Sequence, residues 1–199
     1  MKKLLFALQF VFYSVYSQSI KVATVYGLKD KEANYLLDFM DVSLQKFHFE
    51  GDQLIGKSPS ILIKEFRDGK LVSTDTLLNG KGDAKYLQIK EAKYSFSFFT
   101  EIRNEKLRTF IRHSSYGAGK REFALNKDKY GYALKDFFGA KQELLYDAKD
   151  QIPLLAIITP HDQGNGFASY CEVVQTDILP EDLGKHFGIP HYFLVYISF

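Results

Sequence analysis

The sequence predicts the α+β class: a single domain with a large antiparallel β-sheet, curled or sandwich-like, and two or three short helices. Residues 61–77 and 94–113 each contain two strand-like runs separated by a tight turn, which is typical of antiparallel hairpins. Hydrophobic residues make up 46% of the 199 residues and aromatic residues 16%, enough for a large core. The five prolines are scattered, and no repeat or linker divides the chain, so we expect one domain over 18–199.

The first elements follow from local patterns. Residues 20–26 alternate and are rich in β-branched side chains, which predicts a strand that ends at Gly27. Asp30 is expected to cap a helix, because the apolar residues that follow lie on one helical face: Ala33, Leu36, Leu37, Met40, Leu44 and Phe47. Residues 42–49 also alternate like a strand, so the end of this helix stays open.

The two hairpins have different turn residues. Asp68-Gly69 suits a two-residue turn because glycine tolerates a positive φ. The second hairpin is expected to turn at Asn104-Glu105. Counting outward from that turn gives a register that an antiparallel ladder favours, with Ile102 opposite Leu107, Glu101 opposite Arg108, Thr100 opposite Thr109 and Phe99 opposite Phe110.

The second half of the chain predicts a helix around 141–148 and a buried strand over 152–159. Residues 167–176 alternate, which predicts a strand with Cys171 packed in the core. Pro180 is expected to begin a short helix that ends at Gly188. Residues 191–199 are apolar on both faces, so this strand should be central in its sheet.

Residues 1–17 carry the pattern of an export signal peptide. Lys2 and Lys3 precede an apolar stretch over 4–15, which is shorter than the roughly 20 residues of a membrane-spanning helix. Val15 and Ser17 suit a cleavage site before Gln18. We therefore expect an exported protein, periplasmic or secreted, with no permanent membrane span. The alternative is that this stretch is a buried first element of a cytosolic domain.

Removal of the signal peptide would also change the net charge of the chain. Loss of Lys2 and Lys3 lowers the number of basic residues from 26 to 24, equal to the number of acidic residues. A chain with zero net charge and interspersed signs lacks the basic face that nucleic acid or an acidic membrane surface attracts. We expect no nucleic-acid partner.

The polar loop 160–166 is the candidate binding site. It follows a stiff apolar strand, and polar side chains on such a support often bind ligands. His161, Asp162 and Asn165 are the candidate binding residues, although turn chemistry alone also explains this composition. In the enzymatic alternative, a hydrolase or metal-assisted site would use His161 and Asp162, with His186 or His191 converging on them.

Motifs for other chemistry are missing. Residues 117–120 lack the flanking glycine and hydroxyl residue of a phosphate-binding loop, and His186 and His191 lack the spacing of a helical zinc site. One cysteine cannot form an intrachain disulfide or a cysteine-rich metal site. The sequence predicts no cofactor and no metal. Tyrosines could form a sugar-binding or protein-binding platform, although sheet and core positions account for most rings.

Phe193, Val195, Ile197 and Phe199 alternate at the end of the chain. This pattern resembles the C-terminal strand of bacterial outer-membrane β-barrel proteins, so a small barrel of that family is a second alternative. The apolar opposite face and the expected helices over 30–47 and 180–187 fit such a barrel poorly. The favoured expectation is an exported protein with a binding or structural role, whose partner is an unknown protein or small molecule.

Overall fold

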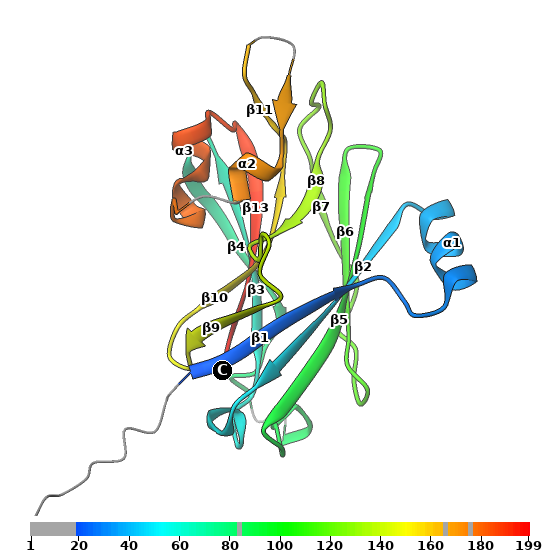
Figure 1. Cartoon of the computed structure of the whole chain (residues 1–199), viewed down its shortest axis with the longest axis vertical. Coiled ribbons are helices and arrows are strands. Elements are labelled where there is room, and N and C mark those ends of the chain that lie inside the picture. Colours follow the sequence, from blue (N-terminus) through cyan, green and yellow to red (C-terminus); the bar gives the residue numbers. More distant parts are fainter. Residues whose placement is uncertain (1–18, 83–84, 165–166, 175–176) are drawn as a thin grey trace, which may run out of the picture.

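Two antiparallel β-sheets face each other in the computed structural model, which describes residues 19–82, 85–164, 167–174 and 177–199 (Figure 1). The predicted α+β class with a large antiparallel sheet is confirmed. The signal peptide expected over 1–17 lies outside the described residues. The first sheet has the strand order β7 (Arg121–Ala124), β6 (Lys106–Arg112), β5 (Lys93–Arg103), β2 (Val42–Glu50), β1 (Ser19–Tyr26) and β9 (Glu143–Asp147).

The second sheet is built around the last strand. Its order is β4 (Lys70–Leu78), β3 (Ser60–Arg67), β13 (His191–Ser198), β10 (Ile152–Ile158) and β8 (Ala133–Asp136). A small hairpin and short helices complete the described fold: β11 (His161–Asp162), β12 (Ala168–Ser169), α1 (Lys31–Phe39), α2 (Cys171–Val174), α3 (Leu183–Phe187), and the 3₁₀ turns Asp52–Leu54, Lys85–Leu87 and Pro180–Asp182. Within the described part of the chain, no helix is long and apolar enough to cross a bilayer.

Two hydrophobic cores hold the layers together. The larger one lies between the sheets and contains Phe47, Phe96 and Phe98 of the first sheet against Ile63, Phe193 and Val195 of the second. A smaller core lies on the other face of the second sheet, where α2 and α3 pack over it (Figure 1). Strand β13 is therefore buried on both faces between β3 and β10, which confirms the predicted central strand.

Both hairpins form as predicted. The turn residues Asp68 and Gly69 have φ of 48° and 69°, and Asn104 and Glu105 have φ of 52° and 56°. Positive φ at both central positions defines the turn whose twist matches that of the flanking strands. The predicted register is confirmed at each position, with Ile102 opposite Leu107, Glu101 opposite Arg108, Thr100 opposite Thr109 and Phe99 opposite Phe110.

The structure resolves the open boundary after the first helix. Asp30 Oδ1 accepts a hydrogen bond of 2.9 Å from the backbone N–H of Ala33, so Asp30 caps α1 as predicted. The helix stops at Met40, and Asp41 has a left-handed φ of 55°. The alternating residues after this turn form β2, which pairs with β1 on one side and β5 on the other.

Two predictions for the second half are wrong. Residues 143–147 form strand β9 instead of a helix, because they pair with the edge of β1, and such pairing overrides a weak local preference. Residues 171–174 form the short helix α2 instead of continuing a strand. In that helix the neighbouring Val173 and Val174 both reach the smaller core, whereas Cys171 is exposed and not packed in the core.

Candidate functional site: an aromatic and charged cleft

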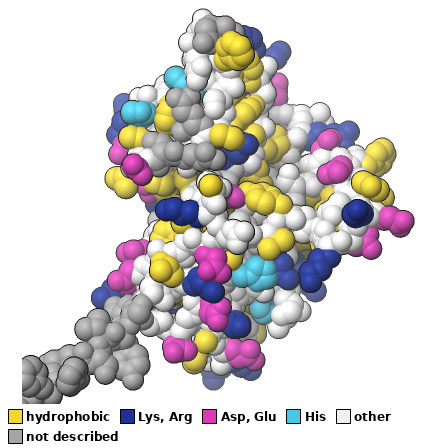
Figure 2. Space-filling model, viewed as in Figure 1, with side chains coloured by type: hydrophobic (Ala, Val, Ile, Leu, Met, Phe, Trp, Pro, Cys, Tyr) yellow, Lys and Arg dark blue, Asp and Glu magenta, His cyan; other side chains and the backbone are white. Residues whose placement is uncertain are grey.

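An open cleft of about 860 Å³ lies at one end of the first sheet, where β1 and β5 begin and β2 ends. We call it the aromatic cleft. Its floor is formed by side chains of the sheet, and its wall by rings from the segments around Tyr86 and 113–116. Figure 2 shows basic, acidic and histidine side chains gathered over this part of the sheet.

The floor follows from strand alternation. Ile20 and Val22 point into the core, so Lys21 between them points outward, and His48 lies in the same way between Phe47 and Phe49. The register places Lys21 opposite Glu50, and Glu50 opposite Lys93. The outward-facing residues of these adjacent strands therefore form the floor of the cleft.

Charges alternate across four strands of the floor. Lys21 Nζ lies 3.2 Å from a carboxylate oxygen of Glu143 and 3.5 Å from one of Glu50, and Lys93 Nζ lies 3.6 Å from Glu50. Hydrogen bonding to Glu143 and its charge raise the pKa of Lys21. The four charges of this row cancel, so the floor is rich in donors and acceptors but electrically balanced.

The wall is a stack of rings. The imidazole of His113 lies 4.5 Å from the ring of Tyr116 and 5.4 Å from that of Tyr94, with interplanar angles of 22° and 18°. The two tyrosine hydroxyls are 2.7 Å apart. Burial raises the pKa of both phenols, which therefore stay protonated at neutral pH. Tyr86 contacts the edge of Tyr116 and is 70% exposed, so its ring is open to a ligand.

The turn after β6 fixes the protonation of His113. The backbone N–H of Ser115 donates to His113 Nδ1 over 3.1 Å, and the N–H of His113 donates to the carbonyl of Tyr116 over 2.8 Å. Nδ1 is thus an acceptor, and burial lowers the pKa of His113. Burial also lowers the pKa of His48, with a contribution from the charge of Lys46. Both imidazoles are neutral at pH 7, with one nitrogen that donates and one that accepts.

The loop expected to bind ligand lies elsewhere. His161 and Asp162 form strand β11, and Asn165 lies outside the described residues. His161 Nδ1 donates to the carbonyl of Phe187 over 3.0 Å. Asp162 accepts from the Tyr130 hydroxyl over 3.0 Å and from the N–H of Gly164 over 2.9 Å, and these hydrogen bonds lower its pKa. The two adjacent side chains are therefore engaged with different parts of the chain.

Of the histidines of the enzymatic alternative, His161 and His186 both contact Phe187, whereas His191 belongs to a different group of contacts. The His186 ring lies against Phe187, 4.7 Å between centroids. His191 is fully buried and bonded to Glu65 and Tyr132 instead. Among the described residues, no group of three or more His, Cys, Asp or Glu is arranged to hold a metal ion.

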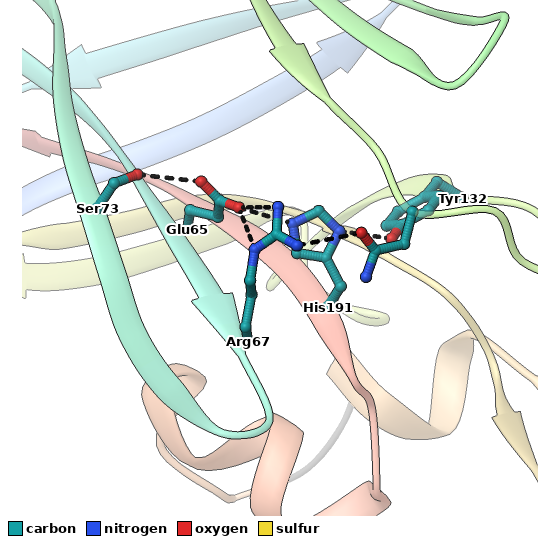
Figure 3. Close-up of polar contacts among 6 residues, drawn as sticks. Glu65, Arg67, Ser73, Tyr132 and His191 are labelled. Atoms are coloured by element: carbon teal, nitrogen blue, oxygen red, sulfur yellow. Dashed lines mark hydrogen bonds and ion pairs between the residues drawn. The ribbon is translucent and has the colours of Figure 1, made fainter.

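His191 belongs to a polar network inside the second sheet (Figure 3). Its Nε2–H donates to Glu65 over 3.1 Å, and its Nδ1 accepts from the Tyr132 hydroxyl over 2.7 Å. Glu65 also accepts from Arg67 over 2.7 Å and from Ser73 over 3.2 Å. These hydrogen bonds link side chains of β3, β4 and β13 to one another, so the network stabilises the second sheet.

Sequence reasoning did not find the aromatic cleft. Its floor comes from residues far apart in the chain, such as Lys21, Glu50 and Lys93, which only the strand register brings together. One signal was available: the second hairpin predicts which residues of β5 and β6 share a face, and Tyr94 and His113 lie at its two open ends. The partner segments around Tyr86 and Tyr116 carried no recognisable pattern.

Comparison of the chain with known protein families, with curated proteins and with solved structures finds no match. The fold and the cleft themselves define the class: a two-sheet antiparallel β-sandwich with peripheral helices and an open cleft on one sheet. Function is therefore argued from the chemistry of that cleft.

Proposed function

We propose that this chain is an exported binding protein and that its aromatic cleft holds an uncharged carbohydrate. The observation that carries the proposal is the ring wall of Tyr86, Tyr116 and His113 beside a charge-balanced floor. Export rests on the sequence of residues 1–17. The cleft volume of about 860 Å³ lies within the range of small-molecule sites.

A carbohydrate suits both surfaces of the cleft. A sugar ring presents C–H groups on its faces, which pack on exposed aromatic rings such as Tyr86. Its hydroxyl groups both donate and accept, and so does the neutral imidazole of His48. His113 can donate to a ligand through Nε2–H, since its Nδ1 already accepts from Ser115. Lys21 and Glu50 add strong donors and acceptors. An ionic ligand would gain little electrostatic binding energy from this floor, because the charges of the floor already neutralise one another.

The paired charges favour binding over hydrolysis. Glycoside hydrolysis needs two carboxyl groups, of which one donates a proton to the leaving oxygen. In the aromatic cleft Glu50 and Glu143 lie on the two strands that flank β1, and each forms an ion pair with Lys21 between them. A lysine therefore occupies the place between the two carboxylates where hydrolysis would need the bond to be cleaved.

Tyr86→Ala tests the site. The mature protein would be screened on an array of neutral oligosaccharides built from glucose, mannose, galactose and N-acetylglucosamine, and its best ligand measured by calorimetry. Loss of the exposed ring should weaken binding by about tenfold. Binding by none of these sugars, or equal affinity of the variant, would overturn the proposal.

The double variant His161→Ala/Asp162→Ala is the matched control. It changes the loop that sequence analysis selected, and we expect unaltered affinity and a normal circular dichroism spectrum. If this variant instead loses the sugar while Tyr86→Ala retains it, the ligand site lies in the 160–166 loop.

A further inference from the structure

Helix α1 stands apart from the rest of the fold. Figure 1 shows it projecting beyond the end of the first sheet where it joins β1 to β2, away from both cores. None of its residues is buried. The large apolar side chains at this end of the molecule are exposed, with Phe39 at 87%: Leu28, Tyr35, Leu36, Phe39 and Met40. Apolar groups gathered in this way mark an interaction surface.

A groove lies directly beside the helix. Its volume is about 680 Å³, and it runs between the end of α1 and the outward face of β2, β5 and β6. Phe98 points into the core, so Phe99 points outward, and its ring lies 5.8 Å from that of Phe110. Val42 adds a third apolar side chain. We call this cavity the α1 groove.

Helix and groove carry opposite charge. Residues 29–41 contain two lysines and four acidic residues, a net charge of −2. The strand side of the α1 groove contains Glu101 and three basic residues, Arg103, Arg108 and Lys120. Arg108 is ion-paired with Glu101 and Glu122, so the positive charge that the groove presents is that of Arg103 and Lys120. The surface thus presents an apolar, acidic helix next to an apolar, basic groove.

We infer that this surface joins two copies of the chain into a symmetric dimer, in which α1 of each copy packs into the α1 groove of the other. A two-fold interface requires that one surface patch contain both complementary elements, and helix and groove meet this requirement. The inference is independent of the proposed carbohydrate site. The acidic helix does not suit anionic lipid, since like charges repel.

Sedimentation equilibrium of the mature protein tests the inference. We expect twice the monomer mass for the native sequence, and at least tenfold weaker association for Phe39→Ser. Phe39 is so exposed that this change should leave the fold of each copy intact. Leu145→Ser is the matched control, because Leu145 is 71% exposed on β9, outside the groove, and should leave the dimer unchanged.

A second variant examines the opposite side of the contact. Arg103→Glu/Lys120→Glu reverses the charge of the groove, so it should also weaken association at least tenfold and leave the spectrum of the monomer unchanged. A native protein that stays monomeric at millimolar concentration overturns the inference. So does a dimer that neither variant weakens, or a monomer that binds vesicles of phosphatidylcholine through Phe39.

Discussion

His191 is a fully buried polar residue at the start of an otherwise apolar strand. Burial lowers its pKa, although the hydrogen bond to Glu65 acts in the opposite direction. Burial alone would raise the pKa of Glu65, but its bonds from Arg67, His191 and Ser73 hold it below the ordinary value. Burial raises the pKa of Tyr132 to about 12, so its hydroxyl keeps the proton that it donates to His191.

Acid should therefore destabilise this protein in two steps. Below the ordinary histidine value of 6.5, the unfolded chain takes up a proton at position 191 before the folded chain does, so the free energy of unfolding falls. The second step follows below the ordinary glutamate value of 4.5, where the unfolded chain protonates Glu65 first. The free energy of unfolding, measured in urea at pH 7, 5.5 and 4, gives the size of both losses.

His191→Gln assigns the first step. Glutamine can still form hydrogen bonds but does not titrate, so the loss of stability between pH 7 and 5.5 should be smaller in the variant. It should not vanish, because burial also lowers the pKa of His48 and His113. An equal loss of stability in both proteins would show that His191 is not responsible.

The two hairpin turns share a geometry but not a sequence. Asp68-Gly69 places a glycine at the second left-handed position, whereas Asn104-Glu105 places a glutamate there. A left-handed conformation costs a residue with a Cβ about 1 kcal/mol or more, and glycine avoids this cost. The second turn is consequently the strained one.

Glu105→Gly should raise the free energy of unfolding by about 1 kcal/mol. Gly69→Ala should lower it, since an added Cβ at position 69 would also come too close to Lys185. Both changes are measured by urea unfolding at neutral pH. A destabilised Glu105→Gly protein would mean that the side chain of Glu105 contributes more than its backbone strain costs.

The sequence predicts well those elements whose structure depends on residues close to one another in the chain. Hairpin register depends on a turn and on the residues counted outward from it, and the helix cap depends on Asp30 and Ala33 alone. Residues 143–147 depend on a partner instead, because they extend along β1 more than 110 residues earlier in the chain. The aromatic cleft needs four strands in register, so sequence analysis placed the candidate site on a loop.

The proposed export concerns the whole chain and leads to a prediction of its mass. Protein isolated from its native host should begin near Gln18, because the signal peptide expected over 1–17 is removed during translocation. Intact-mass spectrometry measures this directly. A mass that still includes residues 1–17 would contradict the prediction and favour a cytosolic protein.

The position of β13 has a consequence for how the molecule folds. It follows every other strand along the chain, yet it lies in the middle of the second sheet between β3 and β10. Until it has emerged from the ribosome, the β3–β4 hairpin and the β8–β10 pair have nothing to join them. Contacts between distant segments also slow folding. The nascent chain should therefore remain incompletely folded until β13 has been synthesised, and an extended chain is the form that a narrow translocation channel can admit.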